Sequence, residues 1–121
     1  MISYSNMIED VKCFLLPQIL VIDDEFINQV FFKESLKKLM ILCDLAGDGP
    51  SGLAMIRSRI EQIKDSEMAV SNYEIIFIDY NMPQMLGTEV ACKIIHMCTD
   101  AQVKQPKMFC CTAEDESNAL R

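Results

Sequence analysis

The stretches ILVIDD (residues 19–24) and IIFID (residues 75–79) decide the fold of this chain, because each is a short apolar run that ends abruptly in aspartate. Continuous apolar runs of this length are typical of parallel strands that are buried on both faces of a sheet. Such strands place ligand sites beyond their carboxyl ends. We therefore expect Asp23, Asp24 and Asp79 to meet at one edge of a sheet.

Around these two runs, strands alternate with amphipathic helices. Apolar residues with a period near 3.6 predict a first helix over about residues 25–38, with Phe26, Ile27, Val30 and Phe31 on its apolar face. Further strands are expected over residues 40–45 and 107–111, and further helices over about 51–64 and 88–98. This alternation predicts an α/β fold built from βαβ units around a parallel sheet.

The second and third helices have predicted caps and faces. Ser51 is a favoured N-cap residue and is expected to begin the second helix. In that helix Arg57 and Arg59 are expected to face water. In the third helix the sequence predicts that Ile94 and Ile95 point inward.

The composition indicates one compact domain. The chain has 121 residues, of which 50% are hydrophobic and 24% are charged, enough for a single core. A formal net charge of -7 argues against a nucleic-acid surface, which needs clustered basic residues. No apolar stretch approaches the length of about 18 residues that spans a bilayer, so we expect no membrane insertion by this segment.

The cysteines predict a reducing compartment. Six cysteines occur without a CxxC pair, and His96 is the single histidine, so neither a zinc site nor a disulfide framework is favoured. Most of these cysteines stand in apolar stretches, which predicts free, buried thiols. We therefore expect a cytoplasmic location, with His96 on the surface.

Three aspartates at one edge of a sheet repel one another. Two like charges about 4 Å apart cost on the order of 4 kcal/mol at an effective dielectric constant near 20. Either the acids take up protons or a cation lies among them, and a set of oxygen ligands favours Mg²⁺. A carboxylate beside such an ion is also suited to attack phosphorus and form an aspartyl phosphate.

Four separated motifs give the chain a specific resemblance: ILVIDDE (residues 19–25), AGDG (46–49), IDYNMP (78–83) with Gly87, and CTA (111–113). Together, and in this order, they resemble the receiver domain of two-component response regulators and hybrid histidine kinases. The resemblance spans about residues 18–116. It implies a flavodoxin-like, doubly wound parallel sheet with strand order 2-1-3-4.

The resemblance also implies roles for individual residues. Asp79 would accept a phosphoryl group from a phosphohistidine, and Asp23 and Asp24 would help to hold Mg²⁺, with the backbone carbonyl of Asn81. Thr112 would be the switch hydroxyl that binds the new phosphate. The phosphodonor would be a histidine kinase or phosphotransfer protein, and the output a downstream effector or a fused kinase domain. The chain would catalyse its own phosphorylation without acting on a separate substrate.

The sequence departs from the family pattern after the fourth strand. Receivers continue with a fifth strand that ends in lysine and with a fifth helix, and neither is expected in this sequence. We therefore expect residues 18–121 to be an incomplete receiver domain that ends in its fourth helix, and residues 1–17 to be a leader or linker. Leu86 also stands where the family usually has aspartate.

Simpler or different interpretations stay open from the sequence. Asp23 and Asp24 would also serve as caps of the first helix, and Thr112 as the N-cap of a capping box with Asp115. A receiver-like scaffold that is not phosphorylated is one alternative function. A Mg²⁺-dependent phosphatase with an aspartyl intermediate is another, although such enzymes usually have an Asp-x-Asp pair and this chain has adjacent Asp23 and Asp24.

Overall fold

The computed structural model describes residues 16–65 and 70–111, which form four strands and three helices. The strands are β1 (Ile19–Ile22), β2 (Cys43–Ala46), β3 (Ile75–Asp79) and β4 (Lys107–Cys111). The helices are α2 (Phe26–Lys38), α3 (Gly49–Asp65) and α4 (Gly87–Ala101). The expected alternation of strands and helices is therefore confirmed.

The strands form one parallel sheet in the order β2-β1-β3-β4, as the resemblance implied. In the register of this sheet, Ile22 at the end of β1 lies between Ala46 of β2 and Ile78 of β3. The carboxyl ends of the three strands are therefore level. The residues that follow β1, β2 and β3 therefore begin at the same edge of the sheet.

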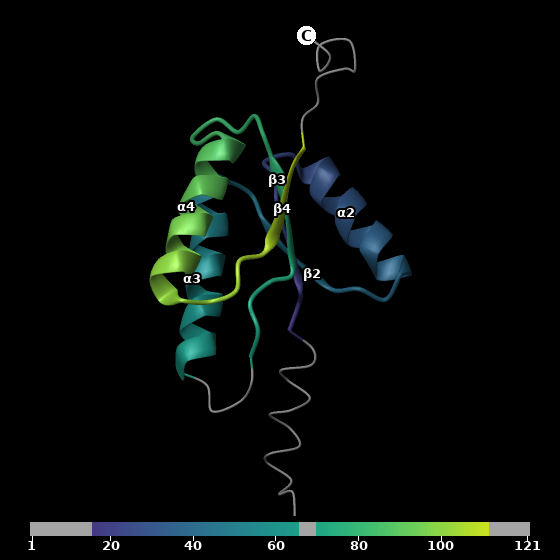
Figure 1. The fold of residues 1–121 in the computed structure, drawn as a ribbon. Coiled ribbons are helices and arrows are strands. Elements are labelled where there is room, and N and C mark those ends of the chain that lie inside the picture. The colour runs from purple at the N-terminus through teal and green to yellow at the C-terminus, as the bar shows by residue number, and fades with distance from the viewer. Residues whose placement is uncertain (1–15, 66–69, 112–121) are drawn as a thin grey trace, which may run out of the picture.

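The two faces of the sheet are covered unequally. Helices α3 and α4 lie together against one face, and α2 lies alone against the other (Figure 1). The core fills the layer between the sheet and the pair α3 and α4, where these side chains are fully buried: Leu20, Ile22, Ile56, Ile76, Ile78, Val90 and Ile94. Helix α3 approaches β1 so closely that a Cβ atom on Gly52 would lie 2.5 Å from Cδ1 of Ile22. The absence of a side chain at Gly52 permits this contact.

Helix α2 is placed as predicted, but its apolar face is not buried. None of its residues is buried, and Phe26, Ile27 and Phe31 are 75%, 79% and 69% exposed. The helix contacts the sheet through one narrow strip, in which the ring of Phe32 lies 5.2 Å from the ring of Phe77. The apolar residues of α2 stay exposed because α2 is the only helix on this face in the described part of the chain.

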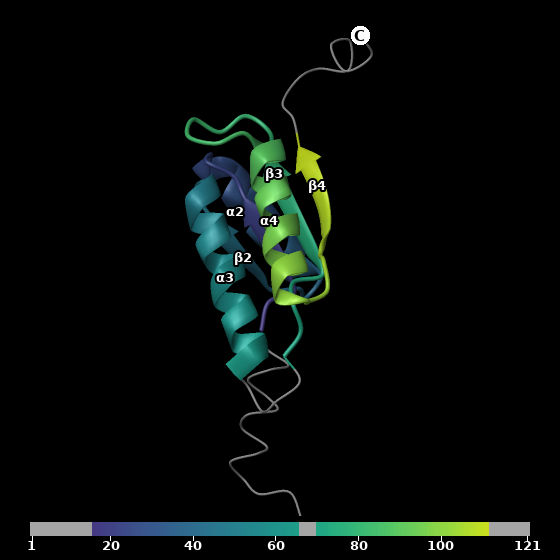
Figure 2. The same ribbon diagram turned by 60° about the vertical axis from the view of Figure 1, so that its left-hand side comes forward.

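Strand β4 lies at the edge of the sheet (Figure 2). Four of its five residues are exposed, and the ring of Phe109 stacks on Phe77 at 5.7 Å. The edge position explains an error about the cysteines. They are free, as expected, but among the described ones only Cys98 is buried, while Cys110 and Cys111 are exposed on β4. An apolar sequence context did not distinguish an edge strand from a central one.

The bounds of β2, α3 and α4 differ from those expected, and α4 ends at Ala101 instead of about residue 98. Strand β2 begins at Cys43 instead of residue 40, because Met40 adopts a left-handed conformation with φ of 59° and ends the turn after α2. Helix α3 begins at Gly49, so Ser51 is not its cap. The Oδ1 atom of Asp48 accepts a hydrogen bond from the backbone N–H of Ser51 at 2.7 Å, which satisfies the first turn.

Two side chains of the helices face the other way from the prediction. Arg59 was expected in water but is 3% exposed, and its contacts are described below. Ile95 was expected to point inward but is 38% exposed, while Cys98 occupies the buried position one turn further on. His96 is exposed, as predicted.

Candidate functional site

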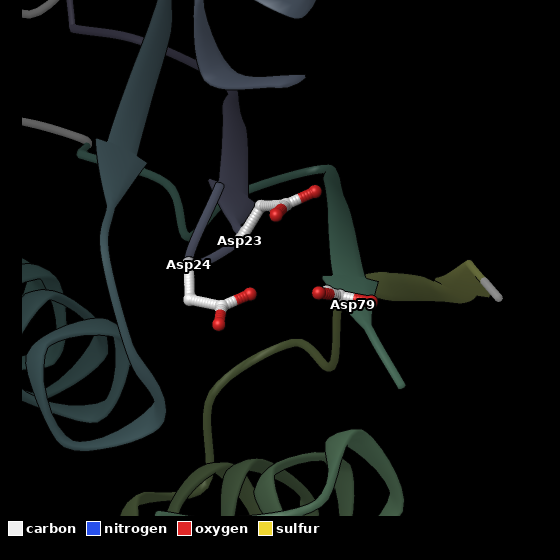
Figure 3. A group of neighbouring side chains, drawn as sticks. All are labelled: Asp23, Asp24 and Asp79. Carbon is white, nitrogen blue, oxygen red and sulfur yellow. The ribbon is translucent and has the colours of Figure 1, made fainter. Parts of the chain in front are cut away.

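Three carboxylates meet at the carboxyl edge of the sheet. Asp23 and Asp24 follow β1 directly, and Asp79 is the last residue of β3. One carboxylate oxygen from each lies within 4.8 Å of the others. Figure 3 shows the carboxylates of Asp24 and Asp79 directed toward each other, with that of Asp23 close by. The predicted convergence of the three side chains is confirmed, and we call this group the carboxylate site.

Asp23 is held rigidly at this site. It is 6% exposed, and its backbone N–H donates to the carbonyl of Ala46 at 3.0 Å. Its Oδ1 accepts from the backbone N–H of Glu25 at 2.9 Å, and its carbonyl accepts from Nε2 of Gln29 at 2.6 Å. The N-cap of α2 is Glu25, so Asp23 and Asp24 do not have the capping role considered from the sequence. No sequence signal had identified Gln29 as a support for this site.

The chain around Asp79 is held by the start of α4. The backbone N–H of Gly87 donates to the carbonyl of Tyr80 at 2.9 Å. A Cβ atom at Gly87 would lie 2.5 Å from the carbonyl oxygen of Asp79 and 2.9 Å from Cα of Tyr80. Backbone atoms cannot move aside as the end of a flexible side chain can. Glycine at this position therefore allows α4 to begin directly against the site.

The electrostatics of the site raise the pKa of Asp79 from 3.8 to about 6. Partial burial is the largest cause, followed by the negative charge of Asp23 and a hydrogen bond to the side chain of Asp24. The backbone N–H of Asn81, 3.4 Å from Oδ1 of Asp79, lowers the pKa in part. Within residues 16–65 and 70–111, the ion pairs are Arg59–Asp44 and Lys104–Glu74, and neither involves the carboxylate site.

These donors fit a hard divalent cation. Three carboxylates within 4.8 Å supply oxygen ligands at the spacing of a shared ion, and a nearby positive charge would offset their mutual repulsion. Asn81 follows two residues after Asp79, and its side chain is exposed. Thr112, the predicted switch residue, lies outside the described residues. Within the described residues no helix is long and apolar enough to cross a membrane.

The sequence is similar to those of histidine kinases. No family model matches the chain. It is 41% identical over 86 residues to hybrid signal transduction histidine kinase F of Dictyostelium discoideum, a match that covers 71% of this chain. The same match covers 7% of the kinase, so the chain spans a small part of the length of that relative.

Solved structures share the fold. The response regulator TrrA from Thermotoga maritima, in complex with Mg²⁺-BeF, matches with a TM-score of 0.63 and 27% identity, covering 86% of this chain and 76% of that one. The receiver domain of the histidine kinase CKI1 from Arabidopsis thaliana, complexed with Mg²⁺, matches with a TM-score of 0.72 over 86% of this chain and 74% of the other. At 24% identity this second likeness concerns the fold alone.

A flavodoxin-like parallel sheet with three acids at its carboxyl edge places the chain in the class of receiver-type domains. The chain belongs to the receiver-domain family of two-component histidine kinases and response regulators. The family resemblance recognised in the sequence is thereby confirmed.

Proposed function

We propose that this domain receives a phosphoryl group on Asp79 in a His-to-Asp phosphorelay. The main support is that Asp79 lies beside two further carboxylates, Asp23 and Asp24, in a sheet of the receiver fold. Two acidic neighbours would only destabilise an aspartate with a purely structural role, because like charges repel. An aspartate that accepts a phosphoryl group beside a metal ion needs neighbouring acids, because these acids bind the ion.

In the proposed reaction, an Oδ atom of ionised Asp79 attacks the phosphorus of a phosphohistidine. The new O–P bond forms as the P–N bond breaks, and the electron pair of that bond leaves with the imidazole. With a pKa of about 6, Asp79 is mostly ionised at pH 7 and able to act as the nucleophile. Its neighbours hold the carboxylate at the surface edge of the sheet, where a donor can approach in line.

Asp23, Asp24, Asp79 and the backbone carbonyl of Asn81 would hold Mg²⁺. The ion would supply positive charge against the oxygens of the transferred group. The burial of Asp23 and its hydrogen bond to Glu25 fix one ligand before binding, while Asp24 is exposed and free to adjust. This arrangement combines one rigid and one adjustable acid around the phosphoacceptor.

We propose that phosphorylation is read at the carboxyl end of β4. The carbonyl of Cys111 accepts a hydrogen bond from the backbone N–H of Tyr80 at 2.8 Å, which joins this end to the loop after Asp79. Thr112, the next residue, would bind the new phosphate and alter the surface offered to a partner. That partner would be a downstream effector or a kinase domain of the same protein, and the domain would act on no separate substrate.

The decisive experiment is Mg²⁺-dependent labelling by acetyl phosphate or a histidine phosphodonor. The parent should be labelled, Asp79→Asn should not be, and the control Asp65→Asn at the exposed end of α3 should match the parent. Equal labelling of Asp79→Asn would refute the assignment of the phosphoacceptor. An unlabelled parent with every donor would favour a scaffold, and turnover of a generic phosphate ester would favour a phosphatase.

A further inference from the structure

A second polar cluster lies near the opposite edge of the sheet and centres on Arg59. The side chain of Arg59 is 3% exposed, although the sequence predicted it in water. Nη2 donates to the carbonyl of Pro17 at 2.8 Å, and Nη1 approaches the carbonyl of Ser71 at 3.4 Å. The guanidinium also lies 3.8 Å from the carboxylate of Asp44 and 4.0 Å from the ring centre of Tyr73.

The other members of this Arg59 cluster are bonded to each other. The hydroxyl of Tyr73 donates to Oδ2 of Asp44 at 2.5 Å. Burial and the hydrogen bond to Asp44 raise the pKa of the Tyr73 hydroxyl, so it remains a donor. Each group in the cluster is therefore satisfied, and the cluster is not a vacant ligand site.

The cluster joins segments that are distant in the sequence. Through one side chain, α3 is bonded to the segment that enters β1 and to the segment that enters β3. The carbonyl of Gln18, beside Pro17, accepts from the backbone N–H groups of Glu74 at 2.8 Å and Ile75 at 3.3 Å. The start of β1 is thus fixed on one side by α3 and on the other by β3.

Packing alone does not require an arginine here. A buried ion pair is often no more stabilising than apolar residues of similar volume. An apolar side chain could fill the space under α3, but it could not donate to the carbonyls of Pro17 and Ser71. The forked guanidinium is suited to hold two carbonyls at once. What Arg59 adds beyond packing is therefore the attachment of these two segments.

We propose that Arg59 anchors the segment that enters β1, residues 16–18, to α3 and to the segment that enters β3, at the edge of the sheet opposite the carboxylate site. A pocket of about 270 Å³, lined in part by Leu16, Pro17 and Met55, lets water reach the anchor. Without the guanidinium, water would compete for these carbonyls. The proposal does not depend on phosphorylation of Asp79.

Amide hydrogen exchange on the full chain tests the anchor. In Arg59→Met, the amides of Glu74 and Ile75, which bond the carbonyl of Gln18, should exchange at least about tenfold faster than in the parent. The amides of Tyr80 and Gly87, at the other edge, should change less than about twofold. The control Arg57→Met, an exposed arginine on the same helix, should leave all four unchanged.

A second variant separates anchoring from general stability. Arg59→Lys keeps the positive charge beside Asp44 but cannot donate to both carbonyls as a fork. The amides of Glu74 and Ile75 should exchange as fast in Arg59→Lys as in Arg59→Met. If Arg59→Met does not fold, Arg59→Lys alone tests the anchor. Unchanged exchange at Glu74 and Ile75, or equal acceleration at both edges, would overturn the proposal. Mg²⁺ titration of Arg59→Lys should give the affinity of the parent.

Discussion

The two edges of the sheet place their half-buried acids in opposite electrostatic surroundings. At the amino edge, Asp44 is bonded by Tyr73 and lies beside the positive charge of Arg59. At the carboxyl edge, Asp79 faces two further acids, and no ion pair reaches it within the described residues. Compensated charges are typical of structure, and uncompensated like charges are typical of a functional site.

The difference lies in neighbours and not in residue type. Both acids belong to parallel strands of one sheet, and both are half-buried. Asp44 lies beside the positive charge of Arg59 and accepts a hydrogen bond from Tyr73. The pKa of Asp79, in contrast, is raised to about 6 by burial and by the negative charge of Asp23. The carboxylates at the carboxyl edge thus repel one another, and a bound cation would offset this repulsion. The following predictions test this contrast, beginning with the largest effect.

The largest effect is expected from a side chain between α4 and the carboxylate site. Gly87→Ala should lower the free energy of unfolding by about 3 kcal/mol, because its Cβ would meet the backbone of Asp79 and Tyr80. Denaturant unfolding measures this change. Gly47→Ala is the matched control: its nearest neighbour is Nε2 of Gln29 at 3.7 Å, and its effect should stay within about 0.5 kcal/mol. Equal losses of stability in Gly87→Ala and Gly47→Ala would show that the close contact between α4 and the backbone of Asp79 does not require glycine.

The second prediction concerns the compensated edge. Asp44→Ala should destabilise the fold by about 2 kcal/mol, because it leaves the Tyr73 hydroxyl without its acceptor and the buried Arg59 without its counter-charge. Glu74→Ala removes an exposed partner of Lys104 and should cost less than about 1 kcal/mol. If both variants unfold at the same denaturant concentration, the cluster contributes no more than a surface pair.

These two edges also show how far sequence pattern could predict this structure. The carboxylate site was predictable, because two aspartates follow one apolar strand and a third ends another, which places three side chains at one sheet edge. The Arg59 cluster was not, because an arginine within a helical repeat normally faces water and its carbonyl partners leave no signature in sequence. The exposure of α2 and β4 could not be predicted from the sequence either. Periodicity indicates which side chains share a face, but not which elements cover that face.

The third prediction is a stabilisation by Mg²⁺. An ion that binds the folded chain at ten times its dissociation constant should add about 1.4 kcal/mol to the free energy of unfolding. We expect this gain in the parent, a smaller gain in Asp24→Asn, and almost none in Asp79→Asn. Thermal unfolding at increasing Mg²⁺ measures it. A full gain in Asp79→Asn would mean that the ion is held elsewhere than at the carboxylate site.

The smallest effect is the pH dependence of Asp79 without divalent ions. Its pKa is raised from 3.8 to about 6 in the folded state, so between these values the folded chain binds more protons than the unfolded chain. Stability should therefore fall as the pH rises through this window. The contribution of this half-exposed group is about 1 kcal/mol once solvent screening is allowed for.

Asp79→Asn isolates that contribution, because asparagine does not titrate. Above pH 6 without Mg²⁺ the variant should be more stable than the parent by about 1 kcal/mol, and the two should converge near pH 4. Other carboxylates titrate in the same range, so the comparison rests on the difference between the two curves. A variant less stable than the parent at pH 7 would mean that the charge of Asp79 is already compensated, and the contrast between the two edges would disappear.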